Sequence, residues 1–148
     1  IQAQILELMR SLQQETATAI VLITHDLGVV AEVADDVVVM YAGRIVERGP
    51  VQALFNAPQH PYTVGLLGSI PRLDTTHQRL ASIEGQVPAP QQLPRGCSFA
   101  DRCPFALAAC RVDIPALRDV GERHQSECLR APLDPEELLV PATEEATA

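Results

Sequence analysis

Four cysteines lie close together in the last third of this chain, and their spacing suggests a metal site. They are Cys97, Cys103, Cys110 and Cys128, in the pattern C-x5-C-x6-C-x17-C. Clustering of this kind in a cytosolic protein favours metal binding over disulfides. Zinc held by four thiolates prefers tight C-x2-4-C pairs, which this pattern lacks, whereas a [4Fe–4S] cluster tolerates wider gaps. On spacing alone, zinc, an iron–sulfur cluster and four buried thiols all stay open.

Residues beside these cysteines favour the cluster. Gly96 allows a backbone N–H to approach sulfur closely, and the Cys103-Pro104 step also occurs in ferredoxin-type sites. His124 is a candidate fifth ligand, a hydrogen-bond donor beside the site, or a structural residue. Three arginines lie within two residues of a cysteine and could offset the charge of four thiolates, although ordinary surface charge explains them as well. They are Arg95, Arg102 and Arg111.

His25 is a second candidate, because it follows a short apolar run directly. The run from Ala19 to Ile23 predicts a strand that is buried on both faces, as in parallel sheets. Ligands of such sheets bind just beyond the carboxyl ends of the strands. Asp26 is the predicted N-cap of a helix over residues 27–34. Taken alone, this junction fits a packing or capping histidine as well as a ligand-binding one.

Other signals predict the elements around these two candidates. Apolar residues at helical spacing over residues 1–12 predict an opening helix. Two β-rich runs flank Ala42-Gly43 and predict a tight hairpin, followed by a helix from Val51 to Asn56. The many prolines of residues 57–130 predict loops and short helical turns, with one helix from Tyr62 to Ser69. The composition of residues 131–148 predicts a disordered acidic tail.

The first part of the chain resembles the last third of an ABC-transporter nucleotide-binding domain. Ile23-Thr24-His25-Asp26 and Met40-x-x-Gly43-x-Ile45-Val46-x-x-Gly49 carry the resemblance, which covers residues 1–57. It implies an α/β fold, namely the C-terminal part of a P-loop (RecA-like) domain with its closing hairpin. His25 matches the switch histidine of that family. The resemblance therefore implies that His25 is a catalytic residue that contacts the γ-phosphate of ATP, which is bound with Mg²⁺.

Residues 58–130 resemble the C-terminal extension of oligopeptide/dipeptide-permease ATPase subunits. The matching residues are His60-Pro61-Tyr62-Thr63, Gly96-Cys97-x-Phe99-x-x-Arg102-Cys103 and His124-x-x-x-Cys128. In some members of that family the four cysteines hold a [4Fe–4S] cluster, which the resemblance implies here, with zinc as the alternative. It also implies partners: a second ATPase subunit in a homo- or heterodimer, membrane permeases and, indirectly, a substrate-binding protein. Related members carry nickel instead of peptides.

Several ATPase motifs have no counterpart in this sequence. The 11 Lys+Arg residues are all arginine, so no Walker A loop ending in Lys-Ser/Thr can be present. Ile1 already lies inside a helical pattern, and we expect a C-terminal piece of a longer ATPase that is inactive alone.

The net charge of −8 argues against nucleic acid, and no apolar run is long enough for a membrane span. The resemblance to importer ATPase subunits implies a peripheral protein at the cytoplasmic face of the inner membrane.

Two other classes of function compete with the importer ATPase. A free-standing iron–sulfur or zinc module would explain the cysteines but not the order of strand, histidine, helix and hairpin. An inert structural extension would explain the prolines but would leave four clustered cysteines as a coincidence. Metal content separates these two classes from each other.

Overall fold

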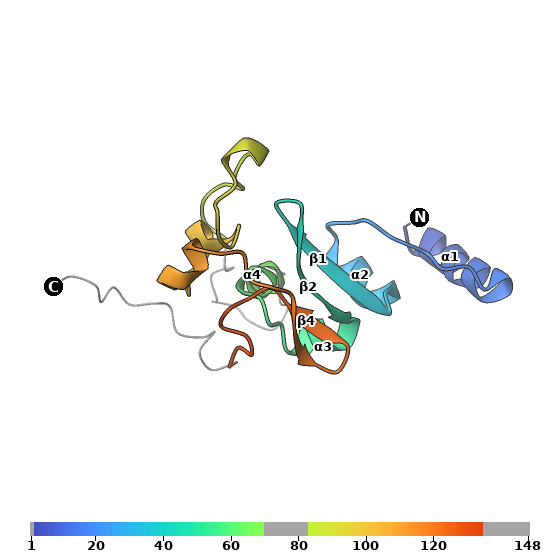
Figure 1. The fold of residues 1–148 in the computed structure, drawn as a ribbon. Helices are drawn as coiled ribbons and strands as arrows, with labels where there is room; N and C mark the ends of the chain where they lie inside the picture. The colour runs from blue at the N-terminus through green and yellow to red at the C-terminus, as the bar shows by residue number, and fades with distance from the viewer. Residues whose placement is uncertain (1, 70–82, 135–148) are drawn as a thin grey trace, which may run out of the picture.

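The computed structural model describes residues 2–69 and 83–134. These residues form four α-helices, three short 3₁₀ turns and four β-strands (Figure 1). In Figure 1, α1 lies at the opposite end of the molecule from the 3₁₀ turns, which are coloured yellow and orange. In chain order the elements are α1 Gln2–Thr16, α2 Leu27–Val33, β1 Asp36–Tyr41, β2 Arg44–Pro50, α3 Val51–Asn56, α4 Pro61–Gly68, η1 Pro90–Gln92, η2 Ala100–Arg102, η3 Ala108–Arg111, β3 Arg118–Gly121 and β4 His124–Ser126.

The predicted hairpin at Ala42-Gly43 is confirmed. Strands β1 and β2 pair in antiparallel register with Tyr41 opposite Arg44, and both turn residues have positive φ angles of 48° and 80°. Positive φ at both central positions is typical of the two-residue turn that matches the twist of a hairpin. The predicted helix Val51–Asn56 is confirmed as α3, with Pro50 at its N-cap.

The helix after His25 also forms where the sequence predicts it. The Asp26 side chain accepts hydrogen bonds from the backbone N–H groups of Gly28 and Val29, which satisfies two of the free donors at the start of α2. Helix α1 matches the predicted opening helix, and α4 matches the predicted helix over residues 62–69 to within a residue. Strong local signals therefore predicted these elements well.

The prediction of a buried strand from Ala19 to Ile23 is wrong in this structure. No strand is formed there, and Val21 and Ile23 are 89% and 94% exposed. A strand buried on both faces needs hydrogen-bonding neighbours at its edges and layers that cover it. None of the described residues pairs with this segment, so it runs as extended chain. The sheet that does form is antiparallel and not parallel.

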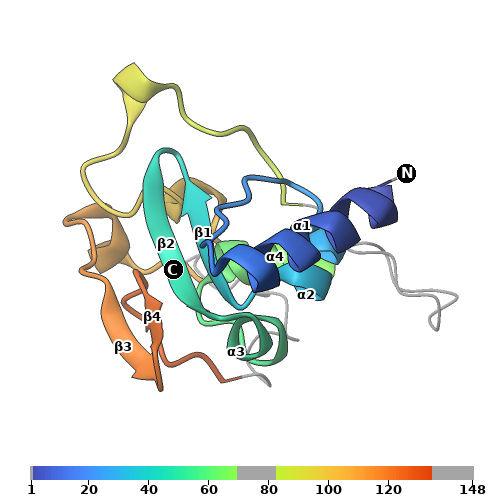
Figure 2. The same ribbon diagram turned by 90° about the vertical axis from the view of Figure 1, so that its right-hand side faces the viewer.

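One four-stranded sheet joins residues that lie far apart in the sequence. The strand order is β1-β2-β4-β3, with every neighbouring pair antiparallel. Figure 2 shows the β3–β4 hairpin beside β2, and Glu47 lies opposite Ser126 in the register. The sequence predicted loops and short turns for residues 57–130. The 3₁₀ turns η1, η2 and η3 agree with this prediction, but the strands β3 and β4 were missed.

The hydrophobic core crosses from the β1–β2 hairpin to the cysteine-rich segment. Tyr41 and Val46 of the hairpin pack with Phe99, and each of the three is 2% exposed. The rings of Tyr41 and Phe99 meet edge to face at 5.2 Å, and Tyr62 of α4 lies against both. Such aromatic contacts stabilise beyond the burial of area alone. Phe99, two residues after Cys97, thereby anchors the cysteine segment to the hairpin. Most of the predicted acidic tail, residues 135–148, lies outside the described residues.

Candidate functional site

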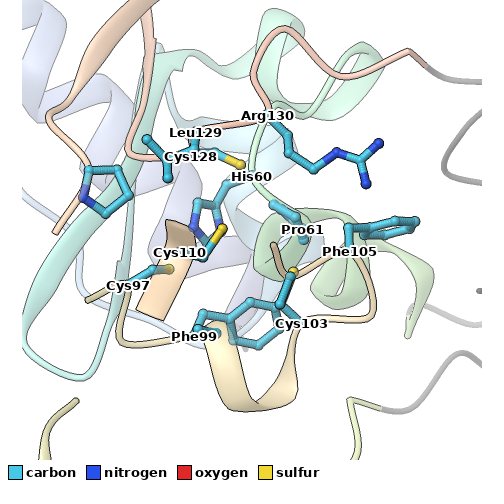
Figure 3. A pocket seen from close by; sticks show the side chains of 13 residues that line it. His60, Pro61, Cys97, Phe99, Cys103, Phe105, Cys110, Cys128, Leu129 and Arg130 are labelled. Carbon is cyan, nitrogen blue, oxygen red and sulfur yellow. The ribbon is translucent and has the colours of Figure 1, made fainter. Parts of the chain in front are cut away.

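The four cysteine side chains line one cavity (Figure 3). Cys97 and Cys103 flank η2, Cys110 belongs to η3, and Cys128 follows β4. The four sulfur atoms at this cavity therefore come from three different parts of the chain. The cavity has a volume of about 20 Å³, which is room for about one water molecule. Its remaining lining is mostly apolar and includes Phe99 and Phe105.

Each cysteine sulfur has a backbone N–H directed at it. For three of the cysteines the donor lies two residues further along the chain, and for the fourth it lies three residues earlier, at 3.4 Å from the sulfur. Such donors favour the thiolate form of cysteine. The pairs, with the cysteine first, are Cys97 with Phe99, Cys103 with Phe105, Cys128 with Arg130 and Cys110 with Leu107.

Burial nevertheless favours the protonated form of three of these thiols, Cys97, Cys103 and Cys128. It raises the pKa of Cys97 and Cys128, and it raises the pKa of Cys103 to about 12. The neighbouring cysteines raise these pKa values further, because several thiolates in one cavity repel each other. A cationic group that binds here must therefore displace protons from sulfur.

Gly96 is required for a different contact from the one predicted. A Cβ atom at this position would collide with the backbone carbonyl oxygen of Cys110 and with the backbone of Arg111. The neighbouring N–H of Cys97 donates to that same carbonyl oxygen at 2.8 Å. Gly96 thus lets two backbone segments approach each other closely, and it holds Cys97 and Cys110 on the same cavity.

The arginines that the sequence singled out do not line the cavity. Arg102 donates to the Tyr41 hydroxyl oxygen and to the carbonyl oxygens of Ile83 and Glu84, and Arg111 pairs with Asp101. The arginine that does line the cavity is Arg130, which stacks its guanidinium group over Phe105. No motif in the sequence pointed to it.

His124 belongs to a buried polar network around Glu47. The side chain of Glu47 is fully buried, and its Oε1 lies 2.7 Å from His124 Nε2. The same oxygen accepts the backbone N–H of Gln59 at 2.7 Å, and Oε2 accepts that of His60 at 2.9 Å. His124 does not line the cysteine cavity, so this geometry supports its structural interpretation. Nothing in the residue pattern pointed to Glu47.

His60 lines the cysteine cavity and was missed as a site residue. In the sequence it stands out only as part of the family motif His60-Pro61-Tyr62-Thr63. The side chain is 1% exposed, and its Nδ1 accepts the backbone N–H of Tyr62 at the start of α4. A histidine at a helix N-cap whose ring must also be buried is the sequence signal that could have identified it.

His25 is exposed at the junction between the extended segment and α2. The Asp26 cap fixes the helix that follows, and the Thr24 hydroxyl oxygen accepts the backbone N–H of Asp26 at 3.0 Å. His25 does not line the cavity that the cysteines share. The chain therefore carries two separate candidate sites.

Comparisons with known proteins decide between the function classes. The C-terminal region of oligopeptide/dipeptide transporters matches residues 46–110. A putative peptide import ATP-binding protein of Brucella ovis is 54% identical over 136 residues, which cover 88% of this chain and 40% of that protein. The dipeptide transport ATP-binding protein DppD of Escherichia coli is 49% identical over 134 residues, 90% of this chain and 41% of that protein. The oligopeptide transport ATP-binding protein AppD of Bacillus subtilis is 56% identical over 117 residues, 79% of this chain and 36% of that protein.

This chain is a homologue of peptide-import ATP-binding proteins. The resemblance inferred from the motifs is thereby confirmed, and the free-standing metal module is disfavoured. The chain spans about 40% of the length of the curated relatives that it matches. No helix among the described residues is long and apolar enough to cross a membrane. Within the same ranges, no group of three or more histidine, cysteine, aspartate or glutamate side chains is arranged to hold a metal ion.

Proposed function

We propose that this chain supplies the C-terminal part of the ATP-hydrolysing subunit of a peptide importer. The identity of 49–56% to proteins named for peptide import and ATP binding carries the proposal. In this proposal the subunit pairs with a second ATPase subunit and docks on membrane permeases at the cytoplasmic face of the inner membrane. A substrate-binding protein delivers the peptide to those permeases.

His25 is the catalytic residue of this proposal. The exposed imidazole follows the extended segment, and the Asp26 cap fixes the backbone beside it. In this position a neutral imidazole can donate a hydrogen bond to the γ-phosphate of ATP and orient the attacking water. Bound Mg²⁺ neutralises charge on the β- and γ-phosphates. The phosphate loop and the Mg²⁺ ligands have no counterpart in this sequence.

We further propose that Cys97, Cys103, Cys110 and Cys128 hold a [4Fe–4S] cluster. Four thiols on one cavity, each with a backbone N–H at sulfur, match the donor set that such a cluster needs. Zinc would need four sulfurs about 4 Å apart around one ion. The C-x5-C-x6-C-x17-C spacing lacks the tight pairs that suit a single zinc ion, which favours the larger cluster over zinc. A cluster held by these four cysteines would link η2, η3 and the segment after β4 through bonds to sulfur.

Transport by a chimera tests the proposed ATPase role. The upstream part of Escherichia coli DppD, ending where the similarity begins, is joined to this chain and expressed in cells that lack DppD. We expect dipeptide uptake and ATP hydrolysis by the purified chimera. His25→Ala should lower the rate of ATP hydrolysis by on the order of 10²–10³-fold, which is the effect of losing one preorganised hydrogen-bond donor. The affinity for ATP should be nearly unchanged. Gln52→Ala on the exposed side of α3 is the matched control. Wild-type hydrolysis by His25→Ala would make His25 a packing residue.

A further inference from the structure

His60 is a buried polar side chain to which the proposed cluster chemistry gives no role. Its ring lines the same cavity as the four cysteines, and in the view of Figure 3 it lies between Cys110 and Cys128. It comes from the turn before α4, a part of the chain that contributes no cysteine. The His60 side chain is only 1% exposed, and a polar side chain that is buried this deeply needs a hydrogen-bond partner.

The hydrogen bond at Nδ1 fixes where the ring carries its proton. Nδ1 accepts the backbone N–H of Tyr62 at 3.1 Å, so its lone pair is in use. A ring nitrogen that accepts a hydrogen bond carries no proton, so the ring is neutral in this geometry. The single proton of the neutral ring is therefore on Nε2. Nε2 then acts as a donor and has no lone pair with which to ligate a metal.

The cavity offers sulfur as the partner for this donor. Among the described residues that line it, the only other side chains able to accept a hydrogen bond are the four cysteines. A neutral thiol accepts weakly, whereas a metal-bound thiolate or sulfide carries negative charge and accepts more strongly. The donor thus becomes useful when the cysteines hold an anionic group.

Glu47 fixes the backbone from which this imidazole projects. Its Oε2 accepts the backbone N–H of His60 at 2.9 Å, and Glu47 itself is fully buried in β2. On the ring itself, Phe99 packs at a centroid distance of 5.9 Å. The backbone of His60 is therefore fixed by Glu47, and its ring is fixed by the hydrogen bond at Nδ1 and by packing against Phe99. The imidazole thus has a defined direction in the cavity.

We propose that Nε2–H of His60 donates a hydrogen bond to a sulfur atom of the cluster held by the four cysteines. This inference rests on the proposed [4Fe–4S] cluster. A hydrogen bond to sulfur stabilises the more negative, reduced state of a cluster, so His60 raises its reduction potential. His60 thereby links β2 of the ATPase part, through Glu47, to the electronic state of the cysteine site.

Potentiometry of two variants tests this proposal. The 148-residue chain is purified without oxygen, reconstituted with ferrous iron and sulfide, and titrated. His60→Asn keeps a strong N-cap, but its shorter amide does not reach as far as Nε2. We expect the equilibrium to shift against reduction about tenfold, ~59 mV for a one-electron couple. Phe105→Leu alters the lining without removing a donor and is the control, with a much smaller expected shift. An unchanged potential in His60→Asn would overturn the proposal while leaving the cluster itself in place.

A second measurement decides the matter if His60→Asn fails to hold a cluster. The wild-type chain is labelled with ¹⁵N-histidine, its cluster is reduced, and pulsed electron paramagnetic resonance is recorded. We expect a weak ¹⁵N coupling and a coupled proton that exchanges with deuterium. Absence of both, or the strong ¹⁵N coupling of a direct ligand, would overturn the proposal. If the wild-type chain binds no iron at all, the cluster and the role of His60 are both rejected.

Discussion

The carboxylate of Glu47 accepts the backbone N–H of His60 at 2.9 Å, thirteen residues further along the chain. The same side chain lies 2.7 Å from His124 Nε2, in a strand that pairs with its own. One buried acidic group therefore joins the hairpin β1–β2, the start of α4 and the last hairpin. The cysteine cavity depends on this junction, because His60 lines it and Cys128 follows β4.

Glu47→Gln should destabilise the chain. The amide has one acceptor oxygen where the carboxylate has two, so one of the three buried donors loses its partner. Leaving a buried donor unpaired costs about 1–3 kcal/mol. We expect a lower urea midpoint with an unchanged slope. Glu122→Gln, which changes an exposed acid beside β4, is the control and should leave the midpoint unchanged. Equal midpoints for both variants would show that Glu47 is not a structural junction.

Acid should destabilise the metal-free chain through His60. Its pKa is about 4 in the folded state and near 6.5 when unfolded. Between these values the unfolded chain binds one more proton, so stability falls as pH drops from about 6.5 to 4 and is fully present above 6.5. The loss can reach on the order of 3 kcal/mol. Urea melts of wild type and His60→Asn across this range measure it. The wild type should lose more stability than the variant, and parallel pH profiles would contradict this assignment.

Gly96→Ala should disrupt the cavity by displacing backbone. The added methyl group would collide with the carbonyl oxygen of Cys110, which cannot rotate away as a flexible side chain could. Overpacking of this kind costs about 1–3 kcal/mol. Gly121→Ala adds the same methyl group with only ordinary contacts to His124 and is the control. Thermal melts should show a loss for Gly96→Ala alone. A melting temperature equal to that of wild type would mean that the 96–97 backbone does not need this close approach.

Local sequence signals predicted the elements that are stabilised locally. The Asp26 cap, the Ala42-Gly43 turn and the helix after Pro50 each depend on a few neighbouring residues. The buried strand from Ala19 to Ile23 was predicted from apolar character alone, but burial needs partners. Those partners are not among the described residues, and Ile23 is exposed.

Long-range pairing explains what the sequence did not predict. Strand β4 is three residues long and becomes a strand by pairing with β2, across the register Glu47–Ser126. Short polar strands of this kind carry no clear alternating pattern. Long-range contacts also explain what the sequence did not predict at the candidate site. The cysteine pattern pointed to one place in the fold, whereas His60, Arg130 and Glu47 reach it or support it through contacts that no local motif encodes.

The iron content of the chain purified without oxygen tests the proposed cysteine site most directly. We predict a brown protein with about four iron and four sulfide per chain, the composition of a [4Fe–4S] cluster. Cys103→Ser should remove most of the iron and the colour, because it removes one of four ligands. Stoichiometric zinc without iron, or four free thiols and no metal, would contradict the proposed cluster.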